Sequence, residues 1–208
     1  MTRLNGPFRA SFAATVLGLS IPVLMTGCST AMTFPTASVA PSYNESPIQL
    51  TAGEFRPVVF VAQVIDDRPS QVAGAVGSTT FTSGQELHRF IHQELEGQLS
   101  SGGVPLGRSK SEAESQSNSH REVSVRIRSV NYGAATSLLH KTVAGINLLV
   151  TVKDESGRPV FAQTYFGSST PGRVWSTAER SGDLMSKAVQ EAVTKALRDG
   201  NFRASVGL

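Results

Sequence analysis

The chain has 208 residues, 39% of them hydrophobic, and its formal net charge is only +3. Its single cysteine excludes a disulfide bond within the chain, so a folded domain must be stabilised by its own hydrophobic core. The basic residues form no stripe along the sequence, which argues against a nucleic-acid partner.

The N-terminal stretch has the proportions of a secretory signal. Arg3 and Arg9 are its only charged residues, and an almost wholly apolar run follows at residues 11–25. A run of about 15 residues is typical of a signal peptide, whereas a membrane-spanning helix needs about 20. Pro22 also interrupts a continuous helix. We therefore predict that residues 1–27 form a removable signal peptide.

The segment Leu24-Met25-Thr26-Gly27-Cys28 resembles a bacterial lipobox, although Met25 stands where leucine is usual. The resemblance implies that Cys28 is lipidated and becomes the first residue of the mature chain. Ser29 in the next position implies sorting to the outer membrane, with the domain facing the periplasm. An ordinary signal peptide followed by an unmodified cysteine remains the alternative.

Residues 28–53 contain one charged side chain, Glu45, and three prolines, without helical or strand periodicity. This composition predicts a flexible tether between the lipid and a domain at residues 54–208. A flexible chain of this length spans roughly 25–30 Å. The alternative is that Ile48 to Phe55 packs on the domain as an edge segment.

The first predicted strand covers residues 57–66. Its apolar side chains occupy both faces, which is typical of a strand that is covered on both sides. Asp66, Asp67 and Arg68 end it, and Pro69 prevents its continuation. The glycine-rich residues 70–82 lack a phosphate-binding pattern and predict a loop or a short hairpin.

The first predicted helix covers residues 84–99, where apolar residues recur at a spacing of three and four. Ser83 and Glu86 have the spacing of a capping box at its N-terminus. Gly102 and Gly103 supply a stop at its C-terminus.

Three strands and a helix are predicted in the second half of the chain. The polar residues 107–121 predict an exposed loop before them. The strands cover residues 122–130, 143–153 and 158–166, the helix covers residues 182–198, and residues 201–208 trail off. The predicted fold class is α/β (α+β), a two-layer sandwich in the order β-α-β-β-β-α. About four strands form a mixed sheet and two helices cover one face.

These features together resemble the YajG-like family of uncharacterised bacterial lipoproteins. The resemblance rests on the lipobox, the strand ending in Asp66-Asp67-Arg68, the helix closing on Gly102-Gly103, the Asp154–Gly157 hairpin and the long last helix. It implies an outer-membrane lipoprotein with a periplasmic α/β domain and no established activity. The order of elements also resembles the auxiliary lipoproteins of lipid-transport ABC systems.

Asp66, Asp67 and Arg68 are one candidate contact site for a ligand or partner, because ligands bind at the carboxyl ends of strands in open α/β sheets. A structural corner, in which an aspartate accepts loop amides and pairs with Arg68, is the alternative. Trp175 is a second candidate contact, either in an aromatic partner patch or as a cap on the core.

His88 and His92 have a spacing used by metal ligands, but no third ligand accompanies them, so we predict neither a metal nor a cofactor. The leading hypothesis is a non-enzymatic protein, anchored in the membrane through the lipid on Cys28, that binds an envelope protein or a lipid. The alternatives are an auxiliary subunit of lipid transport and a hydrolase that uses Asp66 and Asp67.

Overall fold

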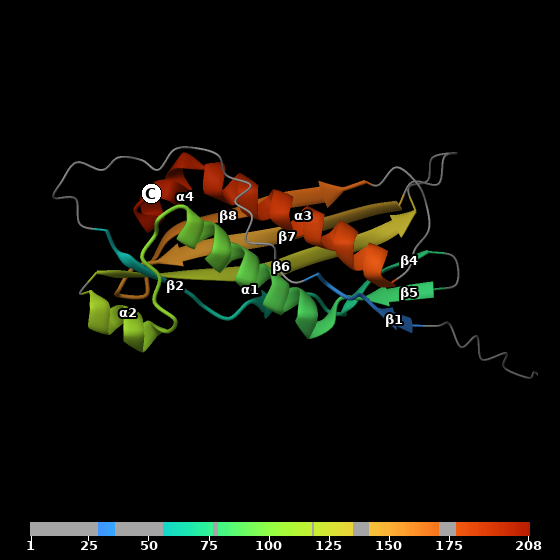
Figure 1. Ribbon diagram of the computed structural model, residues 1–208, viewed down its shortest axis with the longest axis horizontal. Helices are drawn as coiled ribbons and strands as arrows, with labels where there is room; N and C mark the ends of the chain where they lie inside the picture. Colours follow the sequence, from blue (N-terminus) through green and yellow to red (C-terminus); the bar gives the residue numbers. More distant parts are fainter. Residues whose placement is uncertain (1–28, 36–55, 77–78, 118, 135–141, 171–177) are drawn as a thin grey trace, which may run out of the picture.

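A computed structural model describes residues 29–35, 56–76, 79–117, 119–134, 142–170 and 178–208. These residues form an open mixed sheet of eight strands and four helices (Figure 1). The strands are β1 (Ser29–Ala31), β2 (Val58–Val61), β3 (Ile65–Asp66), β4 (Val72–Val76), β5 (Thr79–Thr82), β6 (His120–Ala134), β7 (Thr142–Lys153) and β8 (Pro159–Ser169). The helices are α1 (Gly84–Ser101), α2 (Lys110–Gln116), α3 (Ala178–Arg198) and α4 (Gly200–Val206).

The sheet is built around β6. Its order is β1-β5-β4-β6-β7-β8, and β2 and β3 also pair with β6. Strands β2, β3 and β4 follow one another along the same side of β6, and all three run parallel to it. They amount to one long strand with two interruptions, the second of which contains Pro69. This arrangement places the end of β3 in the middle of the sheet.

Strands β6, β7 and β8 form an antiparallel meander, with β8 at one edge of the sheet. The turn between β7 and β8 is closed by Asp154, whose Oδ1 accepts hydrogen bonds from the backbone N–H groups of Ser156 and Arg158, both at 3.0 Å. Gly157 adopts the left-handed φ of 80° that the turn requires. This confirms the hairpin expected there.

The main core lies between the sheet and helices α1 and α3, which lie side by side in front of it in Figure 1. Along β7 the alternate residues from Thr142 to Val152 are buried toward these helices. Helix α3 approaches β8 closely at Gly167, where an added Cβ would lie 1.8 Å from the carbonyl oxygen of Ala188. A side chain at this position would therefore force the helix away from the sheet.

Strand β2 is covered on both faces, as its apolar sequence predicts. Val59 and Val61 belong to the main core, whereas Val58 and Phe60 pack with Ala113 of α2 in a second cluster. Helix α2 therefore covers a small part of the sheet face opposite α1 and α3. Within the described residues, no helix is long and apolar enough to span a membrane.

The expectation of about four strands and two helices understates the fold. The strand predicted at residues 57–66 is divided into β2 and β3, and residues 70–82 contain the short antiparallel hairpin of β4 and β5, one of the two structures expected there. The unexpected strand is β1, whose three residues are too few for a clear alternation of apolar and polar positions. Residues 107–121 contain α2, and α4 occupies the region expected to trail off. The other five predicted elements are present as α1, β6, β7, β8 and α3.

The expected tether does not begin directly after the cysteine. Ser29 to Ala31 form β1, which pairs in parallel with β5, and Met32 is buried at 2% exposure in the main core. Gly182 of α3 permits this path, because an added Cβ would lie 1.6 Å from the carbonyl oxygen of Thr33. Residues 36–53 of the expected tether lie outside the described residues.

The expected capping box at the start of α1 does not form. Ser83 is the N-cap residue, but its side chain makes no capping hydrogen bond. Its Oγ instead accepts a 2.9 Å hydrogen bond from Nη2 of Arg68. The helix end is as expected, because α1 stops at Ser101 and Gly103 takes a left-handed φ of 79°.

Candidate functional site

The first candidate site is the corner where β3 ends. Asp66 pairs in register with the buried Ile127 of β6, and its side chain points toward the helix layer. There it accepts hydrogen bonds from Arg68, at 2.8 Å from Nε and 2.6 Å from Nη2. The backbone N–H of Arg68 also donates to Oδ1, at 3.1 Å. This is a two-pronged ion pair closed by a local turn.

The pair is largely withdrawn from solvent, with side-chain exposures of 5% for Arg68 and 14% for Asp66. Two residues from the start of the helix layer join it: Ser83, and His88 of α1, whose Nε2 lies 3.4 Å from Oδ2 of Asp66. Burial by itself raises the pKa of Asp66. The hydrogen bonds and charge of Arg68, with a contribution from His88, more than offset this, so the pKa is lowered.

Asp67 points to the opposite face of the sheet. Its carboxylate accepts hydrogen bonds from Nη1 of Arg126 at 3.1 Å and from Nη1 of Arg128 at 2.8 Å. Both arginine side chains are about half exposed, at 47% and 54%. Two exposed guanidinium groups therefore share one carboxylate, which leaves a local excess of one positive charge on this face.

The structure thus separates the two neighbouring carboxylates. Asp66 contacts Arg68, and Asp67 contacts arginines of β6 on the other side of the sheet. A pair of catalytic carboxylates has to share one substrate or one proton, and these two groups do not face a common space. The geometry is that of a structural corner with an exposed arginine pair behind it.

The two histidines of α1 have separate partners. His88 lies beside Asp66, whereas Nε2 of His92 is 3.2 Å from the carbonyl oxygen of Val61 and Nδ1 is 3.3 Å from Oε2 of Glu96. Among the described residues, no group of three or more His, Cys, Asp or Glu side chains is arranged to hold a metal ion. Cys28 and Trp175, the other two candidate residues, lie outside the described residues.

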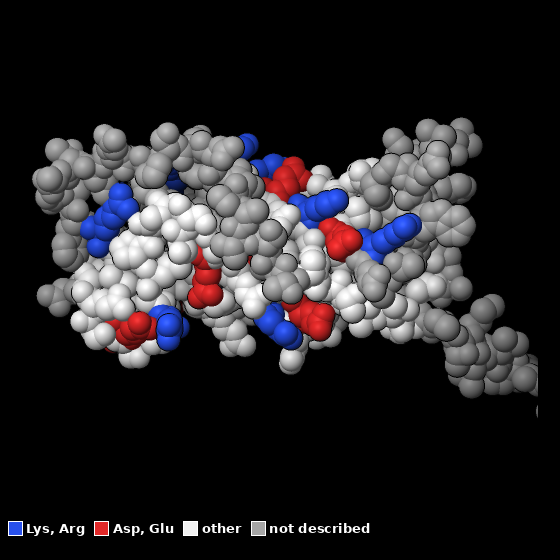
Figure 2. All heavy atoms as spheres, in the orientation of Figure 1, with Lys and Arg blue, Asp and Glu red and all other residues white. Residues whose placement is uncertain are grey.

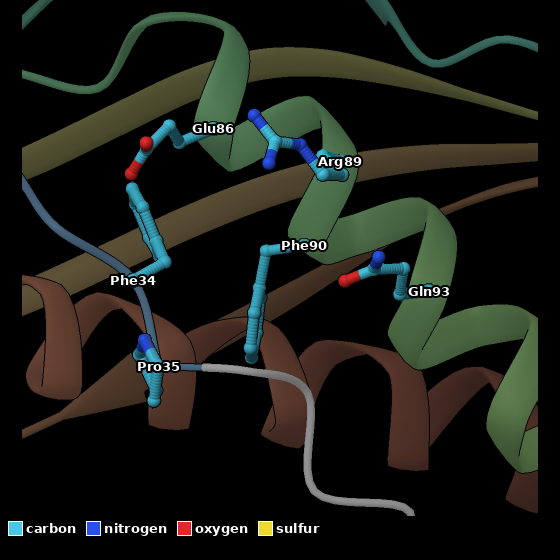
Figure 3. A pocket seen from close by; sticks show the side chains of 6 residues that line it. All are labelled: Phe34, Pro35, Glu86, Arg89, Phe90 and Gln93. Carbon is cyan, nitrogen blue, oxygen red and sulfur yellow. The ribbon is translucent and has the colours of Figure 1, made fainter.

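Sequence reasoning missed a cavity of about 180 Å³ beside the segment that follows β1 (Figure 3). Phe34 and Phe90 provide its apolar wall, with ring centroids 5.8 Å apart. Its polar residues come from the exposed side of α1. The lining residues are Phe34, Pro35, Glu86, Arg89, Phe90 and Gln93.

This cavity is small compared with the roughly 300–1,000 Å³ of sites for drug-sized ligands. It can accommodate one side chain or the end of an acyl chain. The only sequence signal for it was the apolar pair Met32 and Phe34, two residues apart inside a stretch that otherwise has the composition of a linker. That spacing places both side chains on one side of an extended segment.

No family model matches the sequence, and no curated protein matches it significantly. Solved structures are similar in fold. One is protein XCC0632 from Xanthomonas campestris, of the DUF330 family, with a TM-score of 0.56 and 12% identity over 86% of this chain and 96% of that chain. Another is a minor lipoprotein from Acinetobacter baumannii, with a TM-score of 0.42 and 9% identity over 70% of this chain and 94% of that one.

Lipoprotein GNA1162 from Neisseria meningitidis is similar with a TM-score of 0.39 and 10% identity, over 68% of this chain and 99% of its own. The likeness to the Xanthomonas protein shows that this chain shares its fold. The two lipoproteins are too distant in structure to support an argument about function. The resemblance to the YajG-like family stays a prediction, because no comparison matches that family directly.

Proposed function

We propose that this chain is a lipid-anchored protein of the bacterial outer membrane whose domain binds another envelope component in the periplasm. The observation that carries the proposal is the lipobox-like segment ending at Cys28, followed without a gap by β1. A lipid on Cys28 would hold the edge of the sheet at the bilayer surface, because the first strand residue is Ser29.

The described surface supports a binding role more than a catalytic one. Asp66 and Asp67 are each neutralised by arginines, and they lie on opposite faces of the sheet. Acidic and basic side chains are interspersed on the face seen in Figure 2, with no broad area of one sign among the described residues. The exposed Arg126 and Arg128 offer donors to an acidic partner or a phosphate-bearing headgroup.

A role as an auxiliary subunit of lipid transport would require an apolar groove for the lipid. In the described part of the chain, the space between α1, α3 and the sheet is filled by the main core. The cavity beside Phe34 is too small for a whole lipid. We therefore place this role, and that of a hydrolase, behind the binding role.

The experiment compares the full-length protein with two variants in fractionated cells. Cys28→Ser should leave the membrane fraction, because the attachment point is lost. Ser29→Asp should keep the anchor but move the protein to the inner membrane, as the lipobox resemblance implies. Ser115→Ala, an exposed position on α2, is the control. If Cys28→Ser stays with the outer membrane, the proposal is wrong.

A further inference from the structure

The edge strand β8 carries an unusual combination of features. It is 11 residues long, it contains no charged side chain, and residues 159–160 and 162–164 are exposed. Exposed edge strands normally carry charges, prolines or bulges that prevent association with another strand. In β8 only Pro159 and an irregularity of the register at the beginning of the strand serve that purpose.

Two hydrogen bonds between β8 and side chains of α3 show which backbone groups of β8 face away from the sheet. Nζ of Lys195 donates to the carbonyl oxygen of Phe166 at 2.8 Å, and the N–H of Ser168 donates to Oε2 of Glu191 at 2.7 Å. Alternate residues of a strand direct their backbone groups to the same side. The N–H and C=O groups of Thr164 and Ala162 therefore also point away from β7.

Helix α3 thus protects one half of this edge and leaves the other half open. At Phe166 and Ser168 its side chains occupy the outward backbone groups. At Ala162 and Thr164 the described residues provide no partner for them, and both residues are exposed. Two exposed apolar side chains flank the open half: Val160 is 47% exposed and Phe166 is 48% exposed.

We propose that this open edge pairs with the same edge of a second copy of the chain, as antiparallel strands related by a two-fold axis at Gln163. In this register Ala162 of one copy lies opposite Thr164 of the other, and the N–H of each residue donates to the carbonyl oxygen of its partner. The two-fold axis repeats this pair of hydrogen bonds on the other side of Gln163. The exposed start of the strand, at Val160, then lies alongside the exposed Phe166 of the other copy.

Charge favours a second copy as the occupant. The strand is uncharged, so two copies approach without repulsion along the contact. The register also brings the ion pair of Arg158 and Asp154 from one copy toward the end of β8 in the other, where Glu191 is paired with Lys195. Each of these ion pairs is neutral, so the symmetric contact places no uncompensated charge at either end of the paired strands.

The symmetry also determines how the dimer lies on the membrane. This consequence rests on the proposed lipid anchor, whereas the pairing itself does not. The two-fold axis of an antiparallel pair is perpendicular to the sheet. Strand β1 lies at the opposite edge of the sheet from β8, so the two anchors lie far apart in the dimer. Both lipids enter one bilayer only if the sheet lies parallel to the membrane surface.

Disulfide crosslinking of the full-length protein in isolated membranes tests the pairing. The Gln163→Cys variant places two thiols at a pair that is not hydrogen-bonded, where the Cα atoms are about 4.5 Å apart, within the range of a disulfide. We expect a disulfide-linked homodimer after mild oxidation on a non-reducing gel. Ser115→Cys on α2, also exposed, should remain monomeric.

Two charge variants in the Gln163→Cys background test the register. They change Ala162 and Thr164, whose side chains are exposed, so the substitutions do not disturb the sheet. Ala162→Lys with Thr164→Lys places like charges opposite each other across the axis and should lower the crosslinked fraction at least fivefold. Ala162→Glu with Thr164→Lys places opposite charges there and should retain it. A folded Gln163→Cys protein without homodimer, equal crosslinking in both charge variants, or crosslinking only to a different protein would each overturn the proposal.

Discussion

The hydroxyl of Tyr165 in β8 donates a 2.9 Å hydrogen bond to Oδ2 of Asp199, whose Oδ1 accepts the N–H groups of Asn201 and Phe202 at the start of α4. One carboxylate thus joins the edge strand to the last helix and caps that helix. Burial, followed by this hydrogen bond and the charge of Asp199, raises the pKa of Tyr165. The hydrogen bond from Tyr165 contributes most to the lowered pKa of Asp199.

Asp199→Ala should therefore cost more than Tyr165→Phe. The loss of the cap costs about 1 kcal/mol, and the loss of the hydrogen bond about 1 kcal/mol, so Asp199→Ala should lower the free energy of unfolding by about 2 kcal/mol. Tyr165→Phe should lower it by about 1 kcal/mol, and the double variant should match Asp199→Ala. Urea unfolding measures all three, and a Tyr165→Phe loss as large as that of Asp199→Ala would show that the cap contributes nothing.

Asp66→Ala and Asp67→Ala should differ strongly, although the residues are neighbours. The first leaves the guanidinium of Arg68, 5% exposed, without its carboxylate and should cost about 3 kcal/mol. The second removes contacts to two half-exposed arginines and should cost less than about 1 kcal/mol. Equal losses in urea unfolding would contradict the opposite orientation of the two side chains.

Asp154 should account for part of the loss of folding stability at acidic pH. The pKa of Asp154 is lowered from 3.8 to about 2, mainly by the hydrogen bond from the Ser156 side chain. The backbone and side chain of Arg158 lower it further, and burial opposes the shift. A lowered pKa in the folded state stabilises the protein above the unfolded-state pKa, and this contribution is lost as the pH falls from about 4 to about 2.

The measurement is the free energy of unfolding as a function of pH, for the unchanged protein and for Asp154→Asn. The unchanged protein should lose stability over that window, and Asp154→Asn should show a shallower loss there. Parallel curves for the two proteins would assign the acid sensitivity to other groups.

Gly182→Ala should loosen β1. In the interior of a helix, alanine is normally more favourable than glycine by about 1 kcal/mol. Here the added Cβ would lie 1.6 Å from the carbonyl oxygen of Thr33, so the segment after β1 must move. We expect the free energy of unfolding to fall by about 1–3 kcal/mol. Hydrogen exchange should become faster at Met32, whose N–H donates to the carbonyl oxygen of Thr82 at 2.9 Å.

Gly200→Ala is the matched control for this prediction, because nothing lies within 4 Å of a Cβ at that position. It should be neutral or slightly stabilising and should leave the exchange of Met32 unchanged. If Gly182→Ala behaves in the same way, residues 29–35 do not pack against α3 as described.

The longer elements were predictable because each contains a repeating apolar pattern. Strand β2 was recognised because Val58 and Phe60 on one face and Val59 and Val61 on the other are all apolar, and both faces are buried. Strand β1 was missed because Ser29 to Ala31 show no such pattern. They form a strand only because β5, about 50 residues later in the chain, provides the partner.

Helix α4 carries a sequence signal of its own, although residues 201–208 are expected to trail off. Asp199 is a favourable N-cap residue, and Phe202 and Val206, four residues apart, are both buried. The opposite orientation of Asp66 and Asp67 also follows from the alternation of side chains along a strand. That Ser83 and His88 would complete the Asp66 corner depends on how α1 packs, which no local pattern specifies.

The central claim, a lipid anchor at Cys28, is tested most directly by mass spectrometry of the N-terminal peptide of the protein isolated from membranes. The account predicts a mature chain that begins at Cys28 and carries acyl groups on that residue. A mature chain that begins elsewhere, or that begins at Cys28 with an unmodified thiol and amino group, would contradict it.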